Sequence, residues 1–182
     1  FYKSCSPSPL DIFSKSNNIF GISRLKKLID GSDWFNSEED FENDKYALKN
    51  ALEARNKESI KLLLEFNVKL ELNQSEARPV FENIVYMVDK LSNELIEELF
   101  NHLIEALKRN GGLYQLNPSL LYLISGAEKE IITQLGIKSL IKAKYKFNHD
   151  QGSRGENGTQ KSALFKLVQK ERPDSIEDLF KN

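Results

Sequence analysis

The chain has 182 residues, of which 40% are hydrophobic and 29% charged, and a formal net charge of -1. This charge gives no general attraction to nucleic acid or anionic lipid, and no apolar run reaches the ~18 residues of a membrane-spanning helix. The single Cys5 excludes an internal disulfide. We therefore expect a single domain in the cytoplasm, without a nucleic-acid partner or membrane insertion. The start at Phe1, without a methionine, suggests a piece of a longer protein.

The first segment, which we assign to residues 4–40, contains Ser8-Pro9-Leu10-Asp11 and, later, an apolar stretch from Leu25 to Asp30 followed by Asn36. The same order, a short box followed by a longer apolar stretch, recurs more clearly in the next segment. This recurrence is the first sign of an internal repeat.

The second segment, residues 41–74, predicts a helical hairpin. One helix carries Ala47, Leu48, Ala51 and Leu52 at helical spacing, and a second carries Ile60, Leu63 and Leu64 on one stripe. Arg55-Asn56 interrupts the two helices, and we expect Asn56 to take the left-handed backbone conformation of a tight turn. Asn67 is predicted to end the second helix in the same conformation. The tail then alternates as an extended segment does, with apolar residues at Val68, Leu70 and Leu72.

The third segment, residues 75–113, begins with Arg78-Pro79-Val80-Phe81 and matches the pattern more weakly. Its second helix is predicted to run from Asn93 to Arg109, which is unusually long, and to end at Asn110-Gly111-Gly112.

The fourth segment, residues 114–148, opens with Pro118-Ser119-Leu120-Leu121 and continues with Glu130-Ile131-Ile132. After an insertion, residues 137–148 repeat the ending of a second helix. A polar, Gly-rich loop at residues 149–161 follows and is the stretch most expected to be disordered. The last unit, residues 158–182, contains Ser162-Ala163-Leu164-Phe165 and aligns with the second segment without a gap.

This pattern resembles the ankyrin repeat, whose consensus has a T-P-L-H box, a second helix E-I-V-K-L-L-L-E and a G-A-D-V-N tail. Residues 46–49 lie on the box, residues 58–65 on the second helix and Asn67 on the glycine. The chain departs from the consensus at Tyr46, which replaces the capping threonine, and at Arg55, which replaces the turn glycine. The resemblance implies an all-α, ankyrin-like solenoid of about five irregular helix-turn-helix units with short hairpin loops. The box leucine or its equivalent recurs at five positions: Leu10, Leu48, Val80, Leu120 and Leu164.

No motif for catalysis, cofactor binding or metal binding emerges. The Gly-rich loop lacks the Lys-Ser or Lys-Thr pair of a P-loop, because Asn157 stands where the second glycine belongs. Cys5 has no local signature linking it to either histidine, and three Cys and His residues scattered over the chain do not form a metal cluster. We expect His102 to pack on a helix at or near the surface. The predicted protein is not an enzyme and has no cofactor.

Basic and aromatic residues alternate near the end of the fourth segment, where Tyr145 and Phe147 lie among four lysines. These lysines could contact phosphate or an acidic partner, or they could offset the negative end of a helix dipole. Acidic residues on the preceding segment could also pair with them, and we expect Phe147 to take the buried tail position. The four lysines are Lys138, Lys142, Lys144 and Lys146.

The resemblance implies that the protein, as a monomer, binds another protein through a concave surface of first helices and hairpin tips. It also suggests a bacterial effector that acts in a host cytoplasm. Tyr86 and Tyr114 are the strongest candidates, because rigid aromatic side chains often anchor interfaces. The full set of predicted partner-binding residues is Glu42, Asn43, Lys45, Glu53, Ala54, Tyr86, Tyr114, Gln115, Ser125, Lys161, Gln169 and Lys170.

Two other hypotheses stay open. The chain could be the helical, non-catalytic half of a larger enzyme or effector whose active site lies elsewhere. Alternatively, the irregular spacing of the segments could indicate a non-repeat helical bundle with a cavity for a small ligand.

Overall fold

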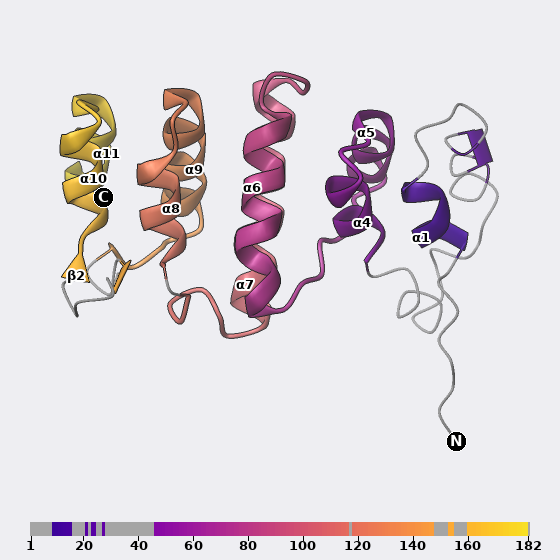
Figure 1. The fold of residues 1–182 in the computed structure, drawn as a ribbon, viewed down its shortest axis with the longest axis horizontal. Helices are drawn as coiled ribbons and strands as arrows, with labels where there is room; N and C mark the ends of the chain where they lie inside the picture. Colours follow the sequence, from indigo (N-terminus) through magenta and orange to yellow (C-terminus); the bar gives the residue numbers. More distant parts are fainter. Residues whose placement is uncertain are drawn as a thin grey trace. The chain divides into compact units, whose positions relative to one another are not determined.

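The structure is a computed structural model, and it describes residues 9–15, 21, 23, 24, 27, 46–116, 118–147, 153, 154 and 160–181. The chain divides into two compact units, residues 1–72 and 73–182, and we describe each by itself. The described part is helical apart from one two-stranded hairpin, which confirms the all-α fold class (Figure 1). The predicted first unit and the residues before position 46 lie largely outside the described part.

The first unit contains α1 (Pro9–Ser14), α4 (Ala47–Glu53) and α5 (Lys57–Glu65). Helices α4 and α5 pack against each other as the predicted hairpin, and α1 packs against α4. The apolar stripes of both helices are buried, because each helix has small or branched apolar residues at helical spacing. The fully buried side chains are Ala47, Leu48, Ala51, Leu52, Ile60 and Leu63. Tyr46, in place of the consensus threonine, provides no side-chain cap to α4.

The turn between α4 and α5 has a different geometry from the one predicted. Arg55, not Asn56, takes the left-handed conformation, with φ of 53°. Asn56 is extended at φ of -86°, and its Oδ1 accepts a hydrogen bond from the backbone N–H of Ser59 at 3.2 Å. Asn is among the best N-cap residues, so this position stabilises the start of α5 and not the end of α4.

The end of α5 agrees with the prediction. Asn67 has φ of 54°, and the backbone N–H of Val68 donates to the Leu63 carbonyl at 2.9 Å. In the tail, Val68, Leu70 and Leu72 are buried, while the residues between them are more exposed.

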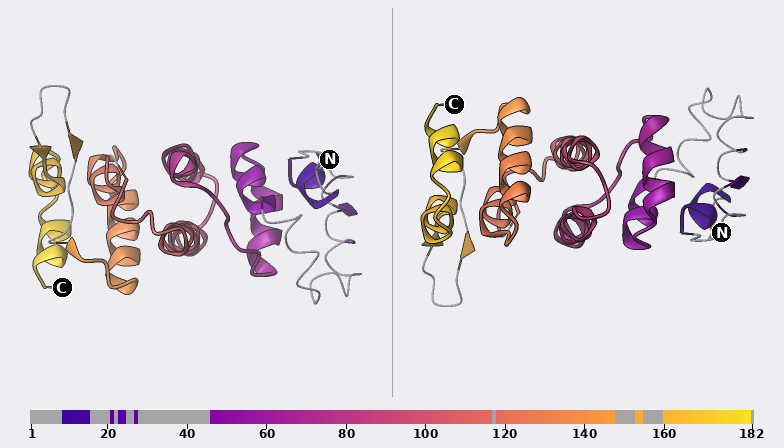
Figure 2. Two further views of the ribbon diagram at one scale, coloured as in Figure 1. Left: turned by 90° about the horizontal axis from the view of Figure 1, so that it is seen from below. Right: turned by 90° about the horizontal axis from the view of Figure 1, so that it is seen from above.

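The second unit contains three helical hairpins and one β-hairpin. In Figure 2 the first helices of the hairpins (α6, α8, α10) form one row and the second helices (α7, α9, α11) form another. Within the rows, α8 packs against α10, while α9 packs against both α7 and α11. The elements are η2 (Gln74–Glu76), α6 (Ala77–Met87), α7 (Asn93–Arg109), α8 (Leu120–Gly126), α9 (Glu130–Lys142), β1 (Ser153–Arg154), β2 (Gln160–Lys161), α10 (Ala163–Gln169) and α11 (Pro173–Lys181).

Helix α7 has the predicted bounds, but the fourth segment differs from the prediction. Helix α9 is one continuous helix of 13 residues, against nine in α5, so the predicted insertion before Ile137 lies within the helix and lengthens it. Tyr145, not Phe147, is the more deeply buried aromatic residue of the tail, at 5% exposure. The predicted loop at 149–161 contains β1 and β2, which pair in antiparallel fashion with Ser153 opposite Lys161.

Five helices end in the same way. In α4, α5, α7, α9 and α10 the second residue after the helix has positive φ, and the N–H of the residue after that donates to the carbonyl of the third-last helical residue. This is the Schellman motif, which satisfies carbonyls that a helix end leaves without partners. The residues with positive φ are Arg55, Asn67, Gly111, Lys144 and Glu171.

Candidate interaction surface

One outward stripe of α6 combines Arg78, Glu82 and Tyr86 at a spacing of four, so these residues share one face of the helix, and Lys90 lies in the turn after it. Arg78 Nε and Glu82 Oε1 form an ion pair at 2.9 Å, with both side chains more than half exposed. Tyr86 is 44% exposed, and Lys90 Nζ lies 4.1 Å from the centre of its ring. The opposite face of α6 is apolar and buried, so the helix presents this stripe to solvent.

A similar pairing joins α8 to α10. Lys166 Nζ on α10 lies 5.5 Å from the centre of the Tyr122 ring on α8. A cation over an aromatic face is attracted by about 0.5–1 kcal/mol at an exposed site. Two first-helix tyrosines, Tyr86 and Tyr122, therefore have a lysine over the ring. We call Arg78, Glu82, Tyr86, Lys90, Tyr122 and Lys166 the first-helix surface.

Tyr114 lies in the loop before α8 and has a structural role. Its ring stacks on Tyr145 with centroids 5.0 Å apart, and Tyr145 meets Phe147 edge-on at 5.3 Å. The Tyr114 hydroxyl accepts a hydrogen bond from the backbone N–H of Lys146 at 2.9 Å. The ring is 37% exposed, so one edge stays accessible while the other fixes the tail after α9.

The predicted ion pairing between the lysine cluster and acidic residues of the preceding hairpin is present, among the described residues, in one pair. Lys138 Nζ on α9 lies 2.7 Å from Glu97 Oε2 on α7. The pKa of Glu94 lies below its ordinary value because its own backbone N–H and the Ser92 hydroxyl donate to it, with a smaller contribution from Lys138. Part of the basic cluster is therefore balanced within the protein.

A buried arginine joins the last two hairpins. Arg172, 5% exposed, donates from Nη2 to the carbonyls of Ala127 at 2.7 Å and Glu128 at 2.9 Å, and from Nη1 to the Thr133 hydroxyl. Thr133 in turn donates to the Ile124 carbonyl at 3.0 Å. Helix α8 ends without a residue of positive φ. The Thr133 hydroxyl binds the Ile124 carbonyl in its last turn, and Arg172 binds carbonyls of the residues that follow the helix.

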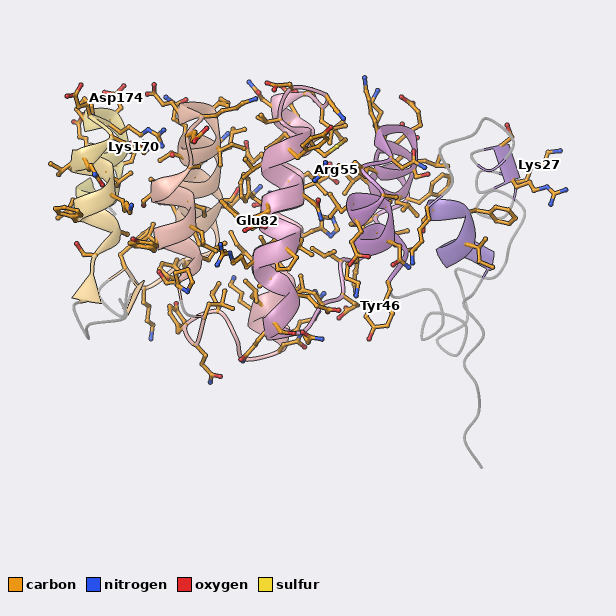
Figure 3. All side chains as sticks on the ribbon, viewed as in Figure 1. Lys27, Tyr46, Arg55, Glu82, Lys170 and Asp174 are labelled. Atoms are coloured by element: carbon orange, nitrogen blue, oxygen red, sulfur yellow. The ribbon has the colours of Figure 1, made fainter. Side chains whose placement is uncertain are left out.

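The predicted partner-binding residues differ in exposure. Glu53, Tyr86, Tyr114, Gln115, Gln169 and Lys170 are exposed, and Ala54 is half-buried. Gln115 also accepts a hydrogen bond from Gln74 at 2.9 Å. Figure 3 shows Lys170 beside Asp174 at the turn end of the α10–α11 hairpin. Glu42, Asn43 and Lys45 lie outside the described residues, as does the side chain of Lys161, whose backbone belongs to β2.

The prediction that Ser125 binds a partner is wrong. Its side chain is fully buried, so it cannot contact a partner on the surface. The sequence alignment matched Leu120 with Leu48, but the N-caps Ser119 and Tyr46 match Leu121 with Leu48 instead. This shift of one residue turns Ser125 from the exposed end of the helix to the buried position equivalent to Leu52.

The sequence interpretation did not identify Lys90, Tyr122 and Lys166 as parts of the surface. Lys90 lies in the turn after α6, so no helical spacing connected it with Tyr86. No pattern within α8 or α10 could have shown that Tyr122 meets a lysine from another hairpin.

His102 agrees with the prediction of a packing residue. It is half-buried, and its pKa is lowered mainly by loss of hydration and further by Arg109. Among the residues that the structure describes, no group of three or more His, Cys, Asp or Glu side chains is arranged to hold a metal ion. None of the described helices has the length and hydropathy needed to cross a bilayer.

Comparison of the chain with protein-family models, with curated proteins and with solved structures finds no match.

Proposed function

We propose that the chain is an ankyrin-like scaffold that binds a partner protein through its first-helix surface and the adjoining loops. Hairpins α4–α5 and α10–α11 support a repeat. In each, the first helix has seven residues and the second has nine, so the two hairpins align position for position. The stacking of α8 on α10, and of α9 on both α7 and α11, is what such a repeat requires.

The exposed ring of Tyr86 beneath Lys90 is the observation that carries this proposal. A buried apolar face holds α6 in place, so the stripe from Arg78 to Lys90 is not needed for packing. Tyrosine offers a large contact area at a low cost in side-chain entropy, and such residues often dominate binding energies. Charges of both signs on the same stripe favour a partner of mixed charge, contacted over about 800 Å² per side.

The test is a binding comparison between the wild-type chain and Tyr86→Ala. A partner is captured from candidate cell lysates, identified, purified and titrated against both chains. We expect Tyr86→Ala to weaken binding by at least about fivefold, which corresponds to 1 kcal/mol. Its thermal unfolding should match that of the wild type, because the ring is largely outside the core.

Phe66→Ala is the matched control. Phe66 is 39% exposed, close to the value for Tyr86, but it follows α5 and does not lie on a first helix. Equal losses of affinity for Phe66→Ala and Tyr86→Ala, or no loss for either, would contradict the proposed surface.

A further inference from the structure

Three lysines at the end of α9 have no counter-charge among the described residues. Lys142 is the last residue of the helix, and Lys144 and Lys146 follow it in the tail. All three side chains are exposed, and none forms an ion pair with a carboxylate of the described part of the chain. One turn earlier, Lys138 is balanced by Glu97 of α7. The end of α9 therefore carries a concentration of unbalanced positive charge.

The helix end does not need these side chains. Backbone N–H groups already satisfy the carbonyls of Ser139, Leu140 and Ile141 at 2.9–3.0 Å. Lysines near a helix C-terminus also offset the helix dipole, but this effect falls off within the last turn. Because Lys144 and Lys146 lie beyond that turn, capping of α9 does not explain them.

The repeat pattern does not explain the lysines either. The equivalent positions after α5 have no net charge, because Glu65 and Lys69 flank the neutral Asn67. Lys144, which corresponds to Asn67, has φ of 56°, a left-handed conformation that asparagine adopts more readily than lysine. The three lysines are therefore particular to this hairpin, and one of them stands at a position that is unfavourable for its backbone.

Aromatic side chains hold the tail that carries the lysines. Tyr145 is buried and contacts both Tyr114 and Phe147, with ring centroids 5.0 Å and 5.3 Å apart. The backbone N–H of Lys146 donates to the Tyr114 hydroxyl at 2.9 Å. Tyr114 itself remains partly exposed, so an accessible aromatic edge lies beside a fixed basic segment.

The same contacts indicate which kind of anion fits. Sites for a single phosphate group rely on free backbone N–H groups, but those of Lys144, Tyr145 and Lys146 all have acceptors within the protein. The buried ring of Tyr145 offers no stacking platform to a nucleic-acid base. A long polyanion or an anionic membrane would also face a chain whose net charge is -1. The ammonium groups alone suit a short segment with several carboxylates.

We propose that Lys142, Lys144 and Lys146 bind an acidic segment of a partner protein, with an apolar residue of that segment against Tyr114. Charge pairs at such a site increase the rate of association and make binding depend on salt. The site lies at the end of a second helix and uses none of the residues of the first-helix surface, so it does not rest on the proposed function.

The probe is a fluorescein-labelled peptide of Glu residues with one central Leu, and its matched control has Gln in place of each Glu. Fluorescence polarisation measures the binding of both peptides to the full chain. We expect only the acidic peptide to bind, with an affinity that falls as salt is added. The variant Lys142→Gln/Lys144→Gln/Lys146→Gln should bind it at least about tenfold more weakly, because three charge pairs are lost together.

Lys57→Gln/Lys69→Gln/Lys170→Gln is the matched control, since it removes three exposed lysines elsewhere and changes the net charge equally. It should bind the acidic peptide within about twofold of the wild type, because distant charges are screened. The same loss in both triple variants would overturn the site, as would a wild type that does not bind the acidic peptide. Circular dichroism checks that each variant is folded. Tyr86→Ala should leave this binding unchanged, which separates the result from a failure of the proposed function.

Two further measurements test the choice of a partner protein. Tighter binding of an oligothymidylate or of phosphatidylserine vesicles than of the acidic peptide would overturn it. The chain also has an acidic run of its own at residues 38–44. Neutralising it with Glu38→Gln/Glu39→Gln/Asp40→Asn should leave the affinity for the peptide unchanged. A gain in affinity would show that the chain's own carboxylates occupy the lysines, and would overturn a separate partner.

Discussion

Hairpins α4–α5 and α10–α11 have nearly the same local structure in different surroundings. Their first helices have seven residues and their second helices nine, and the residue between them, Arg55 or Glu171, has φ of 53° in both. Yet Leu48 is fully buried and its equivalent Leu164 is 40% exposed. Local sequence therefore determines the hairpin, and the neighbouring elements determine which of its leucines become core.

The residue after each turn also has the same local position in both hairpins but different contacts. Asn56 and Arg172 occupy one position, and each donates a side-chain hydrogen bond to a carbonyl more than 40 residues earlier. Asn56 binds the Ser14 carbonyl at 3.3 Å, whereas Arg172 binds two carbonyls and a hydroxyl. The two side chains differ in length and charge, but both connect a turn to the end of an earlier first helix.

The largest expected difference between the hairpins is in the stability lost when their equivalent leucines are replaced by alanine. Leu48→Ala should lower the free energy of unfolding by about 2–5 kcal/mol, because it leaves a cavity in a filled core. Leu164→Ala should cost about 1 kcal/mol or less, because its side chain is already partly hydrated. Urea denaturation followed by circular dichroism gives both values.

Leu63→Ala in α5 is the positive control and should also cost about 2–5 kcal/mol, because Leu63 is fully buried. If Leu48→Ala and Leu164→Ala had equal effects, the difference in burial between the two hairpins would not exist in solution.

A smaller difference is expected between Arg172 and Asn56. Arg172→Met should cost about 1.5–3 kcal/mol, because the carbonyls of Ala127 and Glu128 lose a charged donor in a buried position. Asn56→Ala should cost about 0.5–2 kcal/mol, which is typical for loss of an N-cap. Thermal unfolding of the two variants in one buffer makes the comparison.

Lys170→Met, at an exposed position two residues before Arg172, is the control for replacing a cationic side chain with methionine. Its free energy of unfolding should lie within about 0.5 kcal/mol of the wild-type value. An Arg172→Met variant as stable as Lys170→Met would show that the buried hydrogen bonds add no net stability.

Much of the hairpin architecture could be predicted from the sequence. The bounds of α7 follow from Ser92 as an N-cap and from Gly111 as a left-handed residue, both of which are local signals. The tail from Val68 to Leu72 alternates between buried and more exposed residues as its sequence alternates between apolar and polar ones.

The rest depended on contacts that no local pattern encodes. Left-handed residues such as Arg55, Lys144 and Glu171 are not Gly or Asn, so propensity assigned the conformation at the first turn to Asn56. Ser125 was misplaced because a shift of one residue moves a side chain by about 100° around a helix. The pairing of Tyr122 with Lys166 joins two hairpins, so it required the structure.

The smallest expected effect concerns the turn residue that both hairpins share. A residue other than glycine is strained at positive φ, so Arg55→Gly and Glu171→Gly should each stabilise the protein by about 0.5–1 kcal/mol. Equal gains are expected because φ is the same at both positions. The melting temperature in differential scanning calorimetry is the measurement.

Ala54→Gly is the matched control, since Ala54 lies one residue earlier at a right-handed φ of -74°. There the same substitution should destabilise by roughly 0.5–1 kcal/mol, because glycine loses more backbone entropy and gains no relief of strain. A gain at position 54, or a loss at both 55 and 171, would mean that backbone strain does not distinguish these neighbouring positions. The two hairpins would then share a turn geometry without sharing its energetic cost.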